Sequence, residues 1–312
     1  MLKKNRVIKL PGGASLDFSG PALVMAIVNC NEDSFYPPSR ALRDDAVEKA
    51  LSAEEEGASI IDFGGESSGP GSAPVGEEEE LERVIPVIGA FRKRSPLPVS
   101  VDTRKAAVAR AAMDMGADII NDISGLDDDP LMAALCAERG AAVVLMHRPP
   151  QGALSPAVRE TEQAEDIIAE IGLYLAAAAG RAMSAGISRE KIIVDPGIGF
   201  GKGFGGDLEI IRRMAVFARS SYLAEILGND YPVLIGLSRK SFIGKITGRG
   251  TAAEGAARDA AGRLAGTLAA NGAAIMGGAD IIRVHDVREH VDLARMLFAL
   301  RPQPSFASFT GQ

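Results

Sequence analysis

Short apolar runs in this sequence end repeatedly in side chains that can bind ligands or carry charge. The run that ends at Val101 is followed by Asp102 and Thr103, and Ile119–Ile120 is followed by Asn121 and Asp122. A buried strand avoids such side chains unless they meet hydrogen-bonding partners. Any one of them could simply begin a loop, but eight runs end in this way, at Asn29, Asp62, Asp102, Asn121, His147, Asp195, Ser238 to Lys240, and Arg283 with His285.

The acids and the amide of this set suggest a flat, nitrogen-rich ligand. Asp62, Asp102 and Asp195 are carboxylates at the ends of apolar runs, and each requires donors if it is buried. A heterocycle with an N–H beside an NH2 group supplies two donors in one plane, and Asn121 can both donate to and accept from such a ring. The alternative is that these acids pair with Arg or Lys side chains nearby.

The cations gather elsewhere in the sequence. The segment GLSRKSFIG places Ser238, Arg239 and Lys240 after one apolar run, with Ser241 at the predicted start of a helix. Helix starts bind anions through their free N–H groups. Arg283 follows the next run, so the sequence predicts an anionic substrate. Lys202, in DPGIGFGKG, is a weaker signal of the same kind.

Apolar runs alternate with helical patterns along the chain, which predicts an α/β fold with a parallel sheet. Eight such units between Asn29 and His285 fit a (β/α)8 TIM barrel, in which the carboxyl ends of the strands meet at the active-site face. A doubly wound open sheet is the competing fold. The predicted strands lie within 23–29, 59–67, 97–102, 118–125, 141–147, 191–200, 232–241 and 280–286. The predicted helices span 41–56, 77–94, 104–115, 130–139, 159–185, 207–227, 251–276 and 288–300.

Local signals refine this picture. Pro86 is expected to kink the helix 77–94 or to mark a restart. The repeated endings EEGAS, MGAD, ERGAA and GGAD place a glycine just after a helix, where a C-cap requires one. Residues 1–21 are expected to form a short hairpin or plug beneath the barrel, within a single domain of residues 1–312.

The composition bounds the function. The net charge of −7 argues against a general nucleic-acid-binding protein. Cys30 and Cys136 have no metal-ligand spacing, which is typical of a reducing compartment. The N-terminus lacks an apolar signal segment, and no later apolar run is expected to reach membrane-spanning length. We therefore expect a cytoplasmic protein with neither a membrane nor a nucleic-acid partner.

Eight motifs in order along nearly the whole chain resemble those of dihydropteroate synthases, in the pterin-binding barrel family. The segments SRKSFIG and DPGIGFGK are the most specific of them. The matching segments are NCNEDSF (29–35), DFGGESS (62–68), SVDT (100–103), NDISG (121–125), LMH (145–147), DPGIGFGK (195–202), GLSRKSFIG (236–244) and RVHDV (283–287).

This resemblance implies the condensation of 6-hydroxymethyl-7,8-dihydropterin diphosphate with 4-aminobenzoate to give 7,8-dihydropteroate and diphosphate, with Mg2+ as cofactor and a homodimer as the expected assembly. Lys240, Asp102 and Arg283 would be the catalytic residues. The pterin would bind to Asp102, Asn121, Asp195, Lys240 and Phe200. The diphosphate would bind to Asn29, Arg283, His285 and Ser68, with Asn29 also on the metal, and 4-aminobenzoate would bind to Phe35, Arg239 and Ser241.

Two loops depart from the family's pattern. The first has Asn31 and Glu32 where the family has Thr and Pro, and the second has Ser68 and Gly69 where it has Thr and Arg. The missing arginine normally helps to bind diphosphate. A non-catalytic pterin-binding paralogue therefore stays open as an alternative. A folate-dependent methyltransferase barrel that works with a corrinoid protein is less favoured, because it should lack SRKSFIG.

Overall fold

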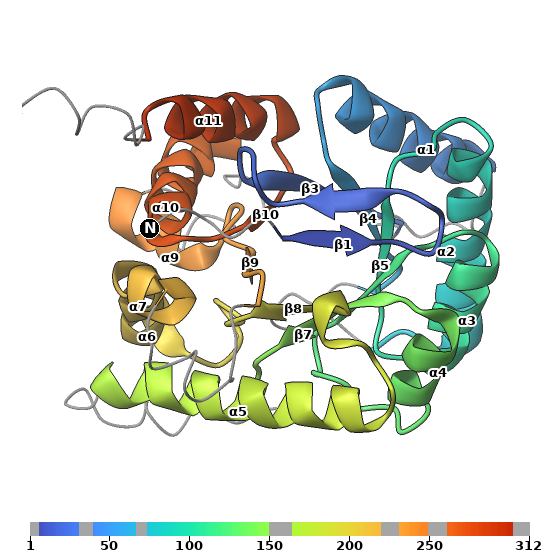
Figure 1. Cartoon of the computed structure of the whole chain (residues 1–312). Coiled ribbons are helices and arrows are strands. Elements are labelled where there is room, and N and C mark those ends of the chain that lie inside the picture. Colours follow the sequence, from blue (N-terminus) through green and yellow to red (C-terminus); the bar gives the residue numbers. More distant parts are fainter. Residues whose placement is uncertain are drawn as a thin grey trace, which may run out of the picture.

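The computed structural model describes residues 6–30, 40–66, 74–149, 164–219, 231–248 and 261–301. Eight parallel strands form a central sheet surrounded by helices (Figure 1). These strands are β3 (Leu23–Asn29), β4 (Ile60–Gly64), β5 (Val99–Asp102), β6 (Ile119–Asp122), β7 (Ala142–Met146), β8 (Ile192–Asp195), β9 (Leu234–Ile235) and β10 (Ile281–Val284).

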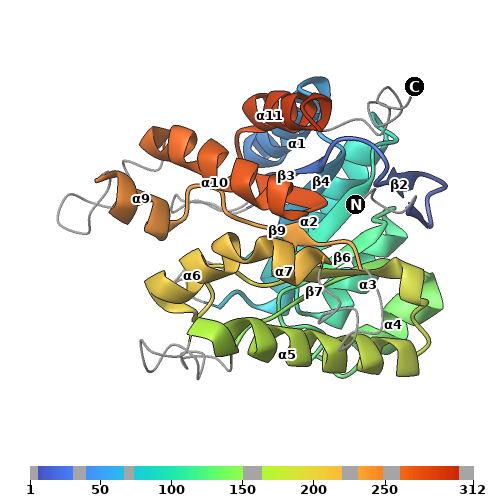
Figure 2. The same cartoon turned by 60° about the vertical axis from the view of Figure 1, so that its left-hand side comes forward.

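The outer layer consists of helices that follow the strands in the chain, and Figure 2 shows the long α5 beside α6 and α7. The helices are α1 (Arg40–Glu55), α2 (Glu77–Arg92), α3 (Ala106–Asp114), α4 (Met132–Arg139), α5 (Ala164–Ser184), α6 (Gly203–Arg212), α7 (Met214–Arg219), α9 (Ser241–Thr247), α10 (Leu264–Gly277) and α11 (Val287–Ala299). Two 3-10 turns, η2 (Arg189–Lys191) and η4 (Ala261–Arg263), precede β8 and α10.

The strand order confirms the barrel. It runs β8-β7-β6-β5-β4-β3-β10-β9, so that strands adjacent in the chain are neighbours and β3 pairs with β10. A parallel bridge between Val194 and Val233 joins β8 to the chain just before β9 and nearly closes the sheet. The doubly wound open sheet is therefore excluded.

Side chains alternate between the two faces of each strand, and this period of two separates the interior of the barrel from its helix-covered outside. Ile119 and Ile193 belong to the core cluster inside the barrel. Their chain neighbours Ile120 and Ile192 belong to the outer cluster, between the sheet and the helices. The interior cluster continues at the amino ends of the strands with Met25, Ile60, Ala142, Val144, Leu234 and Ile281.

An antiparallel hairpin of β1 (Val7–Lys9) and β2 (Ser15–Asp17) closes the barrel at its amino end. Its inward-facing residues Ile8, Leu10, Leu16 and Phe18 are buried in the interior cluster, which confirms the predicted plug. The buried Asp118 Oδ1 accepts the N–H of Gly12 at the hairpin turn at 3.0 Å. The same carboxylate pairs with Arg92, so one acid ties the plug to the helix layer.

Three helices differ from the prediction. Helix α2 is one continuous element through Pro86, so the expected restart is wrong; Pro86 is exposed, while Val84, Val87 and Phe91 hold the inner face against the barrel. The predicted helix 207–227 begins earlier, at Gly203, and breaks between α6 and α7. Of the predicted helix 251–276, residues 251–260 lie outside the described part, and η4 and α10 follow them.

Glycine ends α4 and α10 as the repeated motifs predict. Gly140 and Gly278 are their C-caps, at φ 62° and 118°, a region that L side chains rarely adopt. Each allows the chain to turn at once into the next strand.

Among the described helices, α5 is long and apolar enough at Ile167–Ser184 to cross a membrane, by length and composition alone. The sequence analysis did not predict such a segment. Its buried side chains Ile167, Ile171, Leu175, Ala178 and Ala182 recur every three to four residues and belong to the outer core. This is the pattern of a helix packed on a protein core.

Candidate active site

Four of the predicted ring residues point inward at the carboxyl ends of the strands. The alternation that places Ile60 and Ile119 inside also places Asp62 and Asn121 inside, one step nearer the mouth. Register pairs Asp102 with Asn121 on the neighbouring strands. Asp62, Asp102, Asn121 and Asp195 are all at most 8% exposed.

Arg283 joins this group from β10, which lies far from the other four residues' strands β4 to β8 in the sequence. Its Nε donates to Asp62 Oδ2 at 2.6 Å, and its Nη2 donates to Asp102 Oδ2 at 2.7 Å. Asp62 Oδ2 also accepts the Asn121 side-chain N–H at 3.1 Å. Two of the acids therefore pair with an arginine, as the alternative interpretation anticipated.

Burial sets the protonation of this group. It raises the pKa of Asp102, and the charge of Arg283 opposes that shift. The pKa of Arg283 is raised overall, because Asp62 and Asp102 outweigh the opposing effect of its burial. The Arg283 guanidinium is thus a permanent cation. A ligand that replaces Arg283 at Asp102 must itself supply N–H donors to the carboxylate.

A second inward group surrounds the loop after β8. The Lys240 ammonium donates to the Ile198 carbonyl and lies 4.8 Å from the centre of the Phe200 ring. Asp195 Oδ1 accepts the Gly197 N–H at 2.7 Å and so holds the same loop. Burial lowers the pKa of Lys240 to about 8, against the opposing charges of Asp195 and Asp207.

Lys202 is a structural partner of this loop. It is fully buried and donates to the carbonyls of His147 at 2.9 Å and Phe200 at 3.1 Å. Burial lowers its pKa to about 7, although Asp195 and Asp207 oppose the shift. These bonds join the loops after β7 and β8, and they engage Lys202 within the protein.

The segments after β9 and β10 form one hydrogen-bonded unit. The side chain of Arg239 pairs in bidentate fashion with Asp286, and its backbone has φ 57°. Ser238 Oγ lies 2.9 Å from His285 Nδ1 and accepts the His285 N–H at 3.2 Å. Burial, and then the charges of Arg239 and Arg283, lower the pKa of His285 to about 4, so its ring is neutral at pH 7.

Two helix-start residues follow this unit. Lys240 is the N-cap of α9 and the exposed Ser241 is its first residue, as the sequence predicted. The carboxylate–guanidinium pair with Asp286 occupies the side chain of Arg239, whose role in binding 4-aminobenzoate stays a prediction.

His147 belonged to the predicted ring but faces the other way. It follows Met146 and lies outside the barrel wall, where its ring stacks edge-on with Tyr174 at 4.9 Å. Burial and the charge of Lys202 lower its pKa to about 3. Alternation along β7 therefore removes His147 from the site.

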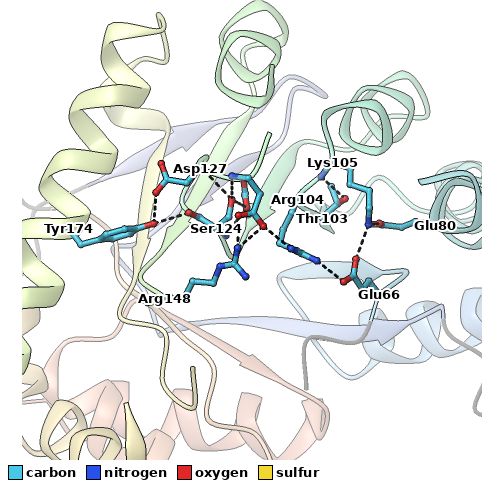
Figure 3. Close-up of polar contacts among 11 residues, drawn as sticks. Glu66, Glu80, Thr103, Arg104, Lys105, Ser124, Asp127, Arg148 and Tyr174 are labelled. Carbon is cyan, nitrogen blue, oxygen red and sulfur yellow. Dashed lines mark hydrogen bonds and ion pairs between the residues drawn. The ribbon is translucent and has the colours of Figure 1, made fainter. Parts of the chain in front are cut away.

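Charged side chains outside the ring connect four neighbouring loops (Figure 3). Arg104 bridges Glu66 at 2.6 Å and Asp128 at 2.7 Å, and Arg148 reaches Asp128 at 2.5 Å. Lys105 joins Glu66 at 2.8 Å. Arg148 is thus paired with Asp128, and the network joins the loops after β4, β5, β6 and β7.

The remaining predicted residues concern the first two loops. Phe35, Ser68 and the departures at Asn31, Glu32 and Gly69 lie outside the described residues. Asn29 is exposed at the carboxyl end of β3. No three His, Cys, Asp or Glu side chains of the described segments gather as a metal site. An amide oxygen at Asn29 nevertheless suits Mg2+, which commonly takes one or two protein ligands together with substrate phosphates and water.

The structure adds to what the sequence indicates at two acids. Asp62 was expected in the ring, but only the structure shows that one of its oxygens accepts from both Asn121 and Arg283. Asp286 was not singled out from the sequence, although it pairs with Arg239. Nothing local in the sequence marks Asp286.

Comparisons with known proteins agree with this geometry. The family model described as "Pterin binding enzyme" matches residues 25–285. Dihydropteroate synthase of Escherichia coli K12 is 41% identical over 92% of this chain and 94% of that protein. The enzyme of Mycobacterium leprae is 38% identical over 89% of this chain and 93% of that protein.

Solved structures give the same result. Xanthomonas albilineans dihydropteroate synthase with 4-aminobenzoic acid superposes with a TM-score of 0.82 and 35% identity, covering 96% of this chain and all of that one. Burkholderia cenocepacia dihydropteroate synthase complexed with 7,8-dihydropteroate gives 0.79 and 34%, covering 95% and 97%.

Proposed function

This chain belongs to the pterin-binding enzyme family and is a dihydropteroate synthase, and on that premise we propose the roles of its individual residues. The reaction breaks the bond between the pterin methylene carbon and the diphosphate oxygen and forms a bond from that carbon to the amine of 4-aminobenzoate. The amine loses a proton, and diphosphate leaves with the electrons of the broken bond.

The pterin is bound by the inward acids and Lys240. Asp102, Asn121 and Asp195 accept from and donate to the polar edge of the ring, and Lys240 donates to its carbonyl and N5. Phe200 lies beneath the ring. The convergence of these side chains at one barrel mouth is the observation that carries the proposal.

The leaving group is stabilised by fixed positive charge and hydrogen bonds. Arg283 and the neutral His285 bind the diphosphate, with Asn29 and Ser68 at its outer side. Fixed donors aimed at developing charge are usually the largest single contribution to catalysis. Mg2+ bound by Asn29 and diphosphate oxygens would supply further charge neutralisation.

The acceptor site lies toward α9. Ser241, Arg239 and Phe35 bind 4-aminobenzoate, the first two at its carboxylate and Phe35 over its ring. This leaves the amine directed at the methylene carbon. Support comes from the neighbouring solved enzyme, whose structure was determined with 4-aminobenzoic acid.

A direct assay tests the proposal. The purified protein is given both substrates and MgCl2, and 7,8-dihydropteroate is measured by chromatography, with EDTA in a parallel reaction. We expect product in the first reaction and little in the second. Product formation that is unaffected by EDTA would remove Mg2+ from the proposal, while pterin binding without product would favour the non-catalytic paralogue.

A cytoplasmic homodimer completes the proposal. Support comes from the two free cysteines and from exposed apolar side chains on the last helices, Ile246, Met276 and Met296. Sedimentation equilibrium should give twice the mass of 32.6 kDa. Cell fractionation tests the location.

A further inference from the structure

One carboxylate oxygen at the centre of the site performs two tasks. Asp62 Oδ2 accepts the Asn121 side-chain N–H at 3.1 Å and the Arg283 Nε–H at 2.6 Å. Asp62 itself is completely buried, and its Oδ1 has no hydrogen-bond partner among the described residues. A buried carboxylate is costly, so its position calls for a reason other than packing.

The bond to Asn121 fixes the orientation of that amide. An asparagine presents an acceptor oxygen on one side and a donor NH2 on the other, and a free amide can flip. Because the Asn121 NH2 faces Asp62, its oxygen is directed to the opposite side. Asn121 can then accept from an N–H on the ligand.

The bond to Arg283 fixes the guanidinium in the same way. With Nε on Asp62 and one Nη2 hydrogen on Asp102, three of its five donors are not used by these bonds. Asp62 holds the Nε edge of the guanidinium against β4. The other edge is left for the leaving group even when a ligand takes over Asp102.

We propose that Asp62 is a positioning residue that sets the amide orientation of Asn121 and the direction of Arg283, and thereby the hydrogen-bond pattern the site offers to the pterin. This inference rests on the proposed function, in which both partners touch substrate. Asp62 acts through them.

A double-mutant cycle on pterin affinity tests the inference. The probe is 6-hydroxymethylpterin, titrated by calorimetry into wild type, Asp62→Ala, Asn121→Ala and the double variant. We expect each single variant to bind about 10- to 100-fold more weakly. The double variant should bind no more than about twofold more weakly than Asn121→Ala. The probe lacks the diphosphate that Arg283 binds, so it reports the role that Asp62 plays through Asn121, and that role is already lost in Asn121→Ala.

A conservative variant and a control complete the design. Asp62→Asn keeps an acceptor oxygen and should regain most of the affinity lost in Asp62→Ala. If the alanine variant does not fold, the cycle is run with Asp62→Leu, which has nearly the same shape as aspartate but no acceptor oxygen. The matched control is Asp122→Ala, a buried acid on the outer face of β6 that accepts from the backbone N–H and the hydroxyl of Ser124. Its pterin affinity should stay within about twofold of wild type.

The outcomes separate the two hypotheses. If Asn121→Ala binds normally, the proposed function of Asn121 fails. The positioning inference fails if Asn121→Ala binds the pterin weakly while Asp62→Ala binds it normally. It also fails if the losses of affinity in the two single variants multiply in the double variant. In both cases the proposed function stands.

Discussion

At the scale of single residues, the site is defined by which buried groups keep their charge. Asp102 and Arg283 pair at 2.7 Å, and Lys240 lies over Phe200. The pKa of Lys240 is lowered to about 8 by burial. Each of these charges has a partner that a ligand must replace, so substitutions that change a charge should affect binding before they affect the fold.

Asp102→Asn should weaken pterin binding about 10- to 100-fold. An amide has a single acceptor oxygen and cannot accept from two ring donors at once, and each unpaired buried donor costs about 1–3 kcal/mol. Calorimetric titration with 6-hydroxymethylpterin measures the loss. The control is Ser100→Ala, at an inward-facing position two residues earlier on β5, which should bind the pterin normally. Unchanged affinity in Asp102→Asn would remove Asp102 from the pterin site.

The pH dependence should report on Lys240. Its pKa is lowered from 10.5 to about 8, so the cation that binds the pterin carbonyl is lost as the pH rises through about 8. We expect kcat/KM to fall above that pH. Lys240→Arg should keep its positive charge, so the alkaline fall in its kcat/KM profile should move to higher pH. If kcat/KM of this variant still falls near pH 8, the titrating group is another one, such as Lys202.

At the scale of elements, the turns after β9 and β10 behave as a unit. Arg239 with Asp286, and Ser238 with His285, connect the two turns on the side where α9 begins. These contacts come from residues 47 positions apart in the sequence. The acceptor site and the diphosphate site therefore share one support.

Asp286→Ala should raise the KM for 4-aminobenzoate about tenfold and change pterin affinity by less than about twofold. A lost charge-assisted bond of about 1.5 kcal/mol accounts for the first effect, and the pterin acids lie on other strands. Glu289→Ala, an exposed acid in the first turn of α11, is the control. If Arg239→Ala is far more damaging than Asp286→Ala, Arg239 binds the substrate directly.

At the scale of the whole molecule, two ends of one barrel serve different purposes. The amino end is closed by the apolar hairpin, and the carboxyl end carries the polar ring. Closing the bottom lets the interior residues pack without water. The rigid strands can then hold buried charges in place at the mouth.

Ile8→Ala should lower the free energy of unfolding by about 2–4 kcal/mol, because its 2% exposed side chain lies in the interior cluster. Urea unfolding measures the change. Its neighbour Val7 is 48% exposed, so Val7→Ala should change stability by less than about 0.5 kcal/mol. Equal effects at both positions would show that the hairpin does not seal the barrel.

The sequence by itself determined the barrel, the order of its strands, the hairpin and the polar residues at the strand ends. Those features are local, since strand and helix periods, helix-ending glycines and loop polarity can be read within a few residues. The same local patterns placed His147 in the ring and predicted a kink or a restart at Pro86.

Only the tertiary structure decided how the ring is connected. Arg283 meets Asp62 across 221 positions of sequence, and Arg239 meets Asp286 across 47. No local pattern specifies such pairs, because a buried charge selects its partner by distance and burial after the sheet has closed. The facing of His147 and the continuity of α2 were likewise set by packing against neighbouring elements.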